Sequence, residues 1–95
     1  MQIFKQYLDH NYSRRVNGGR IEWIVVHYTG ISCAKGSAKF VARSLQSSNA
    51  DTSTHYLVGD DGIIQLVREK HRAWHVGPFK PENKCAACNN NSIGV

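Results

Sequence analysis

The fold of this 95-residue chain is decided by the stretch Ile24-Val25-Val26-His27-Tyr28-Thr29-Gly30. Side chains from Trp23 to Val26 are bulky or β-branched, and such a run between a charge and a glycine predicts a buried central strand within residues 20–28. His27 stands at the carboxyl end of this strand, where α/β sheets commonly bind their ligands. From this segment alone, His27 is either a ligand or a structural histidine bonded to a backbone carbonyl.

An amphipathic helix is predicted after this strand. Apolar residues recur at positions 38, 41, 42 and 45, which share one face at 3.6 residues per turn, whereas Lys39 and Arg43 lie on the opposite face. Ser37 is the predicted N-cap. The spacing therefore predicts a helix of about three turns that begins near residue 37.

A β-hairpin is predicted next. Two β-rich runs occupy residues 52–58 and 63–67, and the Asp-Gly in the connecting residues 59–62 favours a tight turn. Residues 92–95 begin a further β-like run, whereas residues 1–20 predict an N-terminal arm, either a short helical turn or an irregular segment across the domain. This order predicts one α/β domain over the whole chain, a mixed β-sheet with a packed amphipathic helix.

The composition narrows the classes of function. The formal net charge of +5 suits polyanionic surroundings, but Arg14, Arg15 and Arg20 form no basic helical stripe, so nucleic acid is not an expected partner. No apolar run approaches the ~20 residues that cross a bilayer, and no segment resembles a signal peptide, so we expect no membrane insertion and synthesis in the cytoplasm. The odd count of three cysteines fits a reduced environment.

Histidines are the candidate site residues. His55 lies in the first arm of the hairpin, so His27 and His55 are expected on neighbouring strands near one site, where two imidazoles could bind zinc. A catalytic zinc needs three protein ligands, and the spacing around His27 does not complete such a set. A competing closed zinc site would combine two pairs with ligand-like spacing, namely His71 with His75 and Cys85 with Cys88.

Four segments occur in the order typical of one enzyme family. They are residues 24–29, 53–67, 72–77 and 91–95, which read IVVHYT, STHYLVGDDGIIQLV, RAWHVG and NSIGV. Together they resemble the zinc-dependent N-acetylmuramoyl-L-alanine amidases of the type-2 amidase and peptidoglycan-recognition-protein superfamily, above all those of phage endolysins and prophages. The resemblance extends from Trp23 to Val95.

The resemblance implies roles for individual residues. It makes His27 a zinc ligand. Four further residues would line or support the substrate groove: His55, Tyr56, Trp74 and His75. The other two zinc ligands and the catalytic Glu of the family are expected after Val95, so residues 1–95 would be an incomplete domain. Members that use a catalytic Tyr carry it at the position of Thr54, which argues against that mechanism here.

The implied activity is zinc-assisted hydrolysis of the amide bond between N-acetylmuramic acid and the L-alanine of the stem peptide in peptidoglycan. Zn²⁺ would be the cofactor, and the enzyme would be made in the bacterial cytoplasm and act on the cell wall after release. The alternative is a non-catalytic peptidoglycan-binding or regulatory module with the same groove. A sheet edge left open after Val95 would favour self-association.

Overall fold

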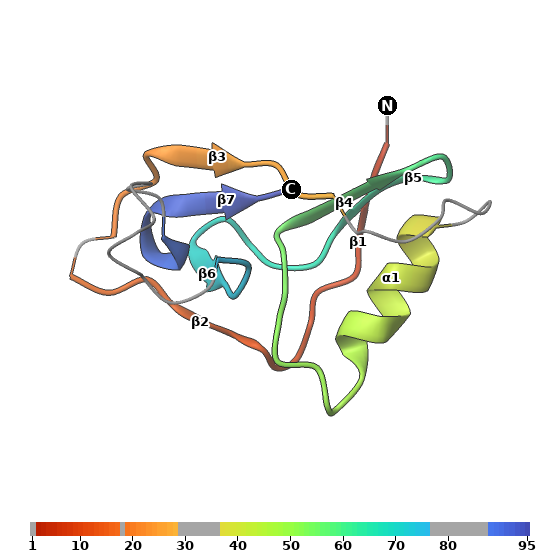
Figure 1. Cartoon of the computed structure of the whole chain (residues 1–95), viewed down its shortest axis with the longest axis horizontal. Helices are drawn as coiled ribbons and strands as arrows, with labels where there is room; N and C mark the ends of the chain where they lie inside the picture. Colours follow the sequence, from red (N-terminus) through yellow and green to blue (C-terminus); the bar gives the residue numbers. More distant parts are fainter. Residues whose placement is uncertain (1, 18, 29–36, 77–87) are drawn as a thin grey trace.

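The computed structural model describes residues 2–17, 19–28, 37–76 and 88–95 (Figure 1). Its elements, in chain order, are β1 (Ile3–Lys5), β2 (Tyr12–Arg14), β3 (Trp23–Val25), α1 (Ser37–Gln46), β4 (Tyr56–Gly59), β5 (Gly62–Gln65), β6 (His71–Ala73), the 3₁₀ turn η1 (Asn89–Asn91) and β7 (Ser92–Gly94). None of the helices in these ranges is long and apolar enough to cross a membrane.

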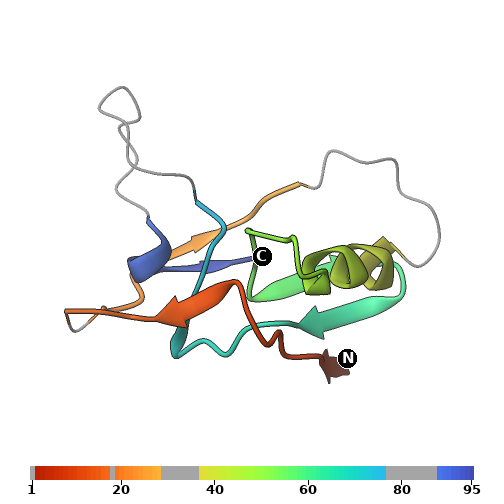
Figure 2. The same cartoon turned by 90° about the horizontal axis from the view of Figure 1, so that it is seen from below.

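Within the described residues, the strands form one three-stranded sheet and two two-stranded pairs. In the three-stranded sheet, β5 lies between β1, to which it is parallel, and β4, to which it is antiparallel. β3 pairs in parallel with β7, and β2 pairs antiparallel with β6. Helix α1 packs beside β4 and β5 (Figures 1 and 2). The mixed strand directions and the packed helix confirm the predicted α/β architecture.

Asp61 links the hairpin to helix α1. Asp60 and Asp61 form the turn between β4 and β5, and Gly62 after them has a φ of +121°, which residues with a side chain rarely adopt. The Asp61 carboxylate accepts hydrogen bonds of 3.2 Å from the N–H groups of Ala38 and Lys39, so it satisfies donors in the first turn of α1. The predicted hairpin and helix are confirmed, and Asp61 caps the helix as well as forming the turn.

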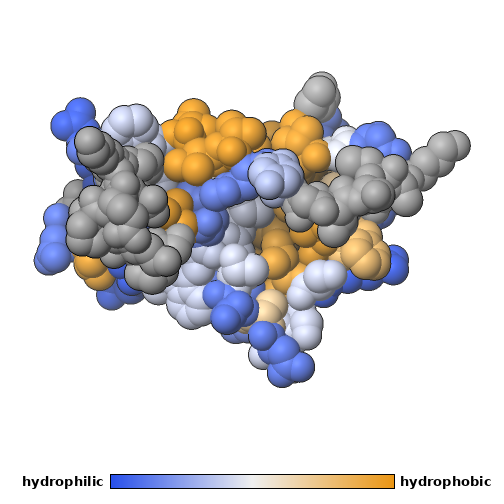
Figure 3. Space-filling view, viewed as in Figure 1, coloured by the Kyte–Doolittle hydropathy of each residue, from blue (hydrophilic) through white to orange (hydrophobic). Residues whose placement is uncertain are grey.

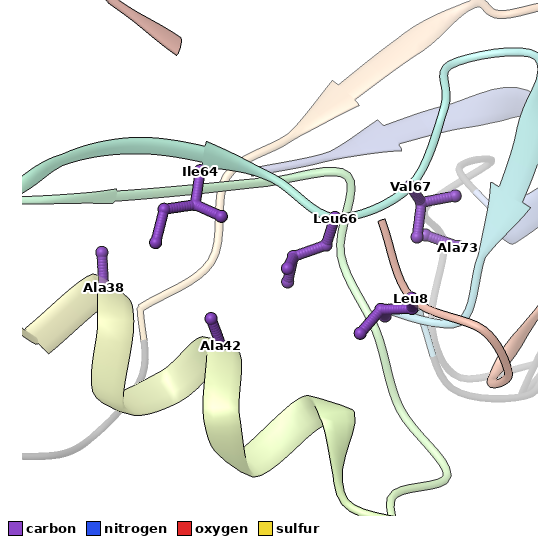
Figure 4. Packing of buried hydrophobic residues seen from close by; sticks show 7 residues of the cluster. All are labelled: Leu8, Ala38, Ala42, Ile64, Leu66, Val67 and Ala73. Carbon is purple, nitrogen blue, oxygen red and sulfur yellow. The ribbon is translucent and has the colours of Figure 1, made fainter. Parts of the chain in front are cut away.

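The hydrophobic core lies between α1, β5 and the N-terminal arm (Figure 4). Ala38 and Ala42 project from the helix towards Ile64 and Leu66. The remaining buried members of the cluster are Leu8, Val67 and Ala73. Because the helix buries alanines, its backbone can approach the sheet closely while the larger side chains of the strands fill the space between them.

The N-terminal arm belongs to the fold, and the predicted helical turn within residues 1–20 is wrong. Residues 3–5 and 12–14 form β1 and β2, whose backbone groups pair with β5 and β6. Between these strands, Leu8 enters the core, and its N–H donates a 2.9 Å hydrogen bond to the C=O of Leu66. Strand pairing satisfies backbone donors and acceptors that a single isolated turn would leave largely to water.

Strand β3 is shorter and more exposed than predicted. It covers Trp23–Val25 of the expected residues 20–28, and His27 lies two residues beyond its end. Among the described strands, β3 pairs with β7 alone, and Ile24 and Val26 are 70% and 76% exposed. The expectation of a buried central strand is therefore wrong, because an apolar run can specify a strand without supplying the neighbours that bury it. Hydrophobic side chains gather on the surface over β3 (Figure 3).

Candidate active site

Three histidines gather around the end of β7. The N–H of His27 donates to the C=O of Val95, and the N–H of His55 donates to the C=O of Gly94, so one histidine lies on each side of this strand end. His75 completes the group, since its Nδ1 lies 2.9 Å from His27 Nε2 and its ring centroid lies 6.2 Å from that of His55. His27 and His55 are thus not on neighbouring strands as expected, because β7 lies between them, and His75 is the direct neighbour of His27.

His55 has a structural position. It is 0% exposed, its Nδ1 accepts a 3.1 Å hydrogen bond from the N–H of Gly94, and its Nε2 donates over 2.9 Å to the C=O of His71. These backbone partners fix the Nε2–H tautomer, because an N–H can only donate and a carbonyl can only accept. Burial lowers the pKa of His55, and the nearby Arg15 guanidinium acts in the same direction. Both ring nitrogens bond to backbone groups, so the geometry favours a supporting position for His55, and its predicted role in lining or supporting the groove stays a prediction.

A backbone carbonyl fixes the hydrogen-bond directions around His75. The Ser92 hydroxyl donates its hydrogen to the C=O of Cys88 over 2.6 Å, so its oxygen accepts from His75 Nε2–H over 3.0 Å. Burial, followed by the neighbouring His27, lowers the pKa of His75 to about 4, so this ring is neutral at pH 7 and its Nδ1 is an acceptor. His27 Nε2 is therefore the donor in the 2.9 Å bond, and in the neutral ring Nδ1 of His27 carries the lone pair.

Gly94 leaves the space that the His75 ring occupies. A Cβ at position 94 would lie 2.7 Å from Cγ of His75 and 2.8 Å from Oγ1 of Thr54, both much closer than ordinary van der Waals contact. A side chain here would displace the His75 ring or shift β7. The glycine of the NSIGV segment is therefore a packing requirement of the site.

A pocket of about 570 Å³ opens beside His27. Its walls come from the residues after β3, one face of α1, and the segment that leads into β4. Most of the lining surface is apolar, and the polar side chains in the lining include His27, Thr54 and His75. A largely apolar cavity of this size with a few convergent polar groups is the usual form of a small-molecule or peptide site.

Tyr56 and His75 line this pocket, whereas Trp74 is not among its lining residues. The Trp74 indole N–H donates a 3.1 Å hydrogen bond to Ser13 Oγ of β2. The Tyr56 hydroxyl donates over 2.7 Å to a carboxylate oxygen of Glu69, and burial together with this carboxylate raises the pKa of Tyr56 to about 12. The roles predicted for Tyr56, Trp74 and His75, to line or support the substrate groove, stay predictions.

Thr54 brings a buried hydroxyl to the pocket wall. Thr54 is 9% exposed, and its Oγ1 has no hydrogen-bond partner among the described residues. Leaving a buried polar group unpaired costs roughly 1–3 kcal/mol. A polar group of a bound ligand that bonded to Oγ1 would remove this cost, so Thr54 is a candidate ligand contact.

Arg15 links the segments of the site through hydrogen bonds, and this role was not predicted from the sequence. Its guanidinium donates to four backbone carbonyls, those of Glu69, Asn89, Asn90 and Ser92. These bonds join the N-terminal arm to η1 and to β7, which carries the Ser92 hydroxyl. No sequence pattern separates Arg15 from the adjacent Arg14, because the carbonyls that Arg15 binds come from distant parts of the chain.

The described residues fit a zinc site only in part. His27 offers an exposed imidazole, and His75 faces it, but Nε2 of His75 is bonded to Ser92. Within the described ranges there is no group of three or more His, Cys, Asp or Glu side chains that could hold a metal ion, whereas a catalytic zinc takes three protein ligands. A complete zinc site therefore needs ligands from outside these ranges.

The competing zinc site is not assembled. The ring of His71 stacks on Tyr12 with centroids 5.2 Å apart, whereas His75 contacts His27. These two histidines and the exposed Cys88 form no group that could hold a metal ion. Cys85, the fourth member of this set, lies outside the described residues.

Comparisons with known proteins identify the family. The family model for N-acetylmuramoyl-L-alanine amidase matches residues 17–95. The structure is similar to that of the catalytic domain of XlyA, with a TM-score of 0.74 and 25% sequence identity, over 99% of this chain and 59% of that one. The chain thus spans less than two thirds of the solved structure, and no curated protein matches it. Because the family model matches most of the residues, the chain belongs to the N-acetylmuramoyl-L-alanine amidase family.

Proposed function

We propose that the chain is part of a peptidoglycan amidase that hydrolyses the amide bond between N-acetylmuramic acid and the L-alanine of the stem peptide. Family membership supports this class of reaction. The observation that carries the proposal is the exposed His27 beside the 570 Å³ pocket, with its Nε2 bonded to His75. This arrangement puts one imidazole nitrogen next to a cavity large enough for part of a glycopeptide.

We further propose that His27 is one ligand of a zinc ion whose other ligands lie outside the described residues. When bound, zinc lowers the pKa of a water molecule to ~7 and polarises the scissile carbonyl. Within this chain, His75 holds the His27 ring and Thr54 offers a hydroxyl to the substrate. The expected setting is that of a phage or prophage lysin, made in the cytoplasm and acting on the cell wall after release.

The test combines binding and product analysis with purified, insoluble peptidoglycan. The chain is incubated with peptidoglycan and Zn²⁺, co-sedimentation is measured, and new amino termini and new reducing sugar ends are quantified. New N-terminal L-alanine that disappears with a chelator and in His27→Ala supports the amidase. His10→Ala is the matched control, since His10 is a second partly exposed histidine that bonds to Asp9 and Ser47 instead. New reducing ends, or amino termini other than L-alanine, contradict the proposed bond.

A second candidate function is a peptidoglycan-binding or regulatory module. It is favoured by the incomplete ligand set, since the described ranges hold no group of three potential metal ligands. Co-sedimentation without new amino termini supports this module over the enzyme. Failure to co-sediment with peptidoglycan contradicts both functions.

The Thr54 hydroxyl offers a separate measure of substrate contact. Thr54→Val keeps the shape of the side chain and removes an oxygen that has no partner in the described structure, so the free energy of unfolding should stay the same or rise. Affinity for soluble muropeptides should fall about 5-fold, as expected for the loss of one hydrogen bond of about 1 kcal/mol. Isothermal titration checks the affinity, and an unchanged value removes Thr54 from the proposed contacts.

A further inference from the structure

A series of hydrogen bonds connects a backbone carbonyl to His27, the candidate zinc ligand. It starts at the C=O of Cys88, passes through the hydroxyl of Ser92 and the ring of His75, and ends at Nε2 of His27, with lengths of 2.6, 3.0 and 2.9 Å. The carbonyl at its start can only accept, so the Ser92 hydroxyl donates to it and accepts from His75 Nε2–H, and in a neutral His75 ring Nδ1 is then left to accept from His27. The direction of these bonds therefore leads to one tautomer of His27, with hydrogen on Nε2.

Ser92 and His75, the middle members of this hydrogen-bond series, are held in place by further hydrogen bonds. Ser92 is fully buried in β7, and its C=O accepts a 2.9 Å hydrogen bond from Arg15. The side-chain oxygen of Asn89 accepts from the N–H groups of His75 and Val76, over 3.0 and 2.7 Å. The Ser92 hydroxyl and the backbone of His75 are thus both held by the segment that carries η1 and β7.

We propose that Ser92 and His75 are positioning residues that fix the tautomer and the orientation of His27. Histidines that bind metal ions usually donate their second N–H to an acceptor, which orients the ring and makes the other nitrogen more basic. Here the acceptor is Nδ1 of His75, and the nitrogen left for a metal ion is Nδ1 of His27. The inference rests on the proposed function only in treating His27 as a zinc ligand.

The first test needs no substitution and no activity. Long-range ¹H–¹⁵N correlation spectra of the zinc-free chain at pH 7 distinguish a protonated from an unprotonated ring nitrogen in each histidine. We expect hydrogen on Nε2 of both His27 and His75. Hydrogen on Nδ1 of His27 overturns the inference whether or not the chain cleaves peptidoglycan, so its failure is separable from a failure of the proposed function.

The second test removes the acceptor. In His75→Ala, the His27 nitrogen signals should move towards those of mixed tautomers, and the affinity for Zn²⁺ alone should fall about 10-fold. His75→Asn supplies a side-chain oxygen near the position of Nδ1 and should restore both the signals and most of the affinity. Ser92→Ala should shift the His27 signals through His75, which then lacks its own acceptor.

Controls separate positioning from general damage to the fold. His10→Ala removes a histidine that lies in the N-terminal arm, and it should change neither the His27 signals nor the Zn²⁺ affinity. Unchanged His27 signals in a folded His75→Ala chain overturn the inference. Equal losses of Zn²⁺ affinity in His75→Ala and His75→Asn overturn it too, because a residue needed only for packing would not be rescued by a hydrogen-bond acceptor.

Discussion

Strands β5 and β3 are both apolar, yet the region around β5 is buried and β3 is largely exposed. β5 lies between β1 and β4 under helix α1, and the residues that follow it, Leu66 and Val67, are fully buried. β3 and the Val26 that follows it form the longest bulky apolar run of the chain, but Ile24 and Val26 are largely exposed. The region around β5 is stabilised by packed side chains, whereas the β3–β7 region is held by polar bonds from Arg15 and Ser92. Apolar sequence thus specifies a strand, and neighbours decide its burial.

The largest expected effect separates the two strands directly. Leu66→Ala should lower the free energy of unfolding by about 2–5 kcal/mol, because it leaves a cavity between α1 and the sheet. Ile24→Ala should change it by no more than about 0.5 kcal/mol, because the side chain is already in water. Urea denaturation measures both values, and similar losses in the two variants would break the contrast.

The next largest loss of stability is expected when the hydrogen bonds of Arg15 in the β3–β7 region are removed. Arg15→Ala removes the donor of four backbone carbonyls and should cost about 1–3 kcal/mol, since part of this network is exposed to water. Arg14→Ala is the matched control and should cost less than about 0.5 kcal/mol, because Arg14 is exposed. Equal losses in the two variants would show that Arg15 acts only through its charge.

Local patterns in the sequence were sufficient for the elements near β5. The helix follows from apolar positions 38, 41, 42 and 45, and the hairpin follows from Asp-Gly between two β-rich runs. The final strand was predicted at 92–95 and is observed as Ser92–Gly94. For the helix and the hairpin the deciding interactions lie within a few residues, so periodicity and turn chemistry carry the information, whereas β7 was predicted from its β-like composition and pairs with the distant β3.

The features that depend on distant contacts were missed. The sequence predicts either a short helical turn or an irregular segment in residues 1–20, and neither alternative includes β1 and β2, because their pairing partners, β5 and β6, lie far along the chain. His27 was recognised from its strand-end position and from family resemblance, but its bond to His75 was not expected. The role of Arg15 was equally invisible, since it depends on where four carbonyls converge in space.

The free energy of unfolding is expected to depend on pH through His55, which bonds to both the β5 region and the β3–β7 region. His55 accepts at its C=O from Leu66 N–H after β5 and donates from its N–H to Gly94 of β7. Burial lowers its pKa in the folded state, and the unfolded value is about 6.5. Below pH 6.5 the unfolded chain binds more protons, so the free energy of unfolding should be highest above this pH and fall as the solution is acidified. His75, whose pKa burial also lowers, adds to the same trend.

His10 supplies the control for this pH effect. Its hydrogen bond with the Asp9 carboxylate raises the pKa of His10, so its contribution has the opposite sign and is present below pH 6.5. His10→Ala should therefore make the loss of stability between pH 7 and pH 5 slightly steeper. Denaturant titrations at several pH values measure this, and a stability that rises on acidification would contradict the neutral state of buried His55.

The smallest effect on stability concerns the exposed face of β3. We expect the chain to self-associate through this strand, because unpaired edges with apolar side chains invite pairing with another copy. Val26→Lys should lower the average mass by light scattering at high concentration and change the free energy of unfolding by no more than about 0.5 kcal/mol. Val58→Lys, at a similarly exposed valine of β4, is the control, and an equal drop in mass there would count against β3 as the contact.

The parallel pairing of β3 with β7 also has a consequence for the order of folding. Trp23 pairs with Ser92, so this ladder joins segments that are far apart in the sequence, whereas the β4–β5 hairpin joins adjacent ones. Closing a long loop costs chain entropy before any contact repays it, so we expect the hairpin and α1 to form early and the β3–β7 pair late. His27, His75 and Ser92 would then meet only in the last steps, and a folding intermediate would hold a core without a site.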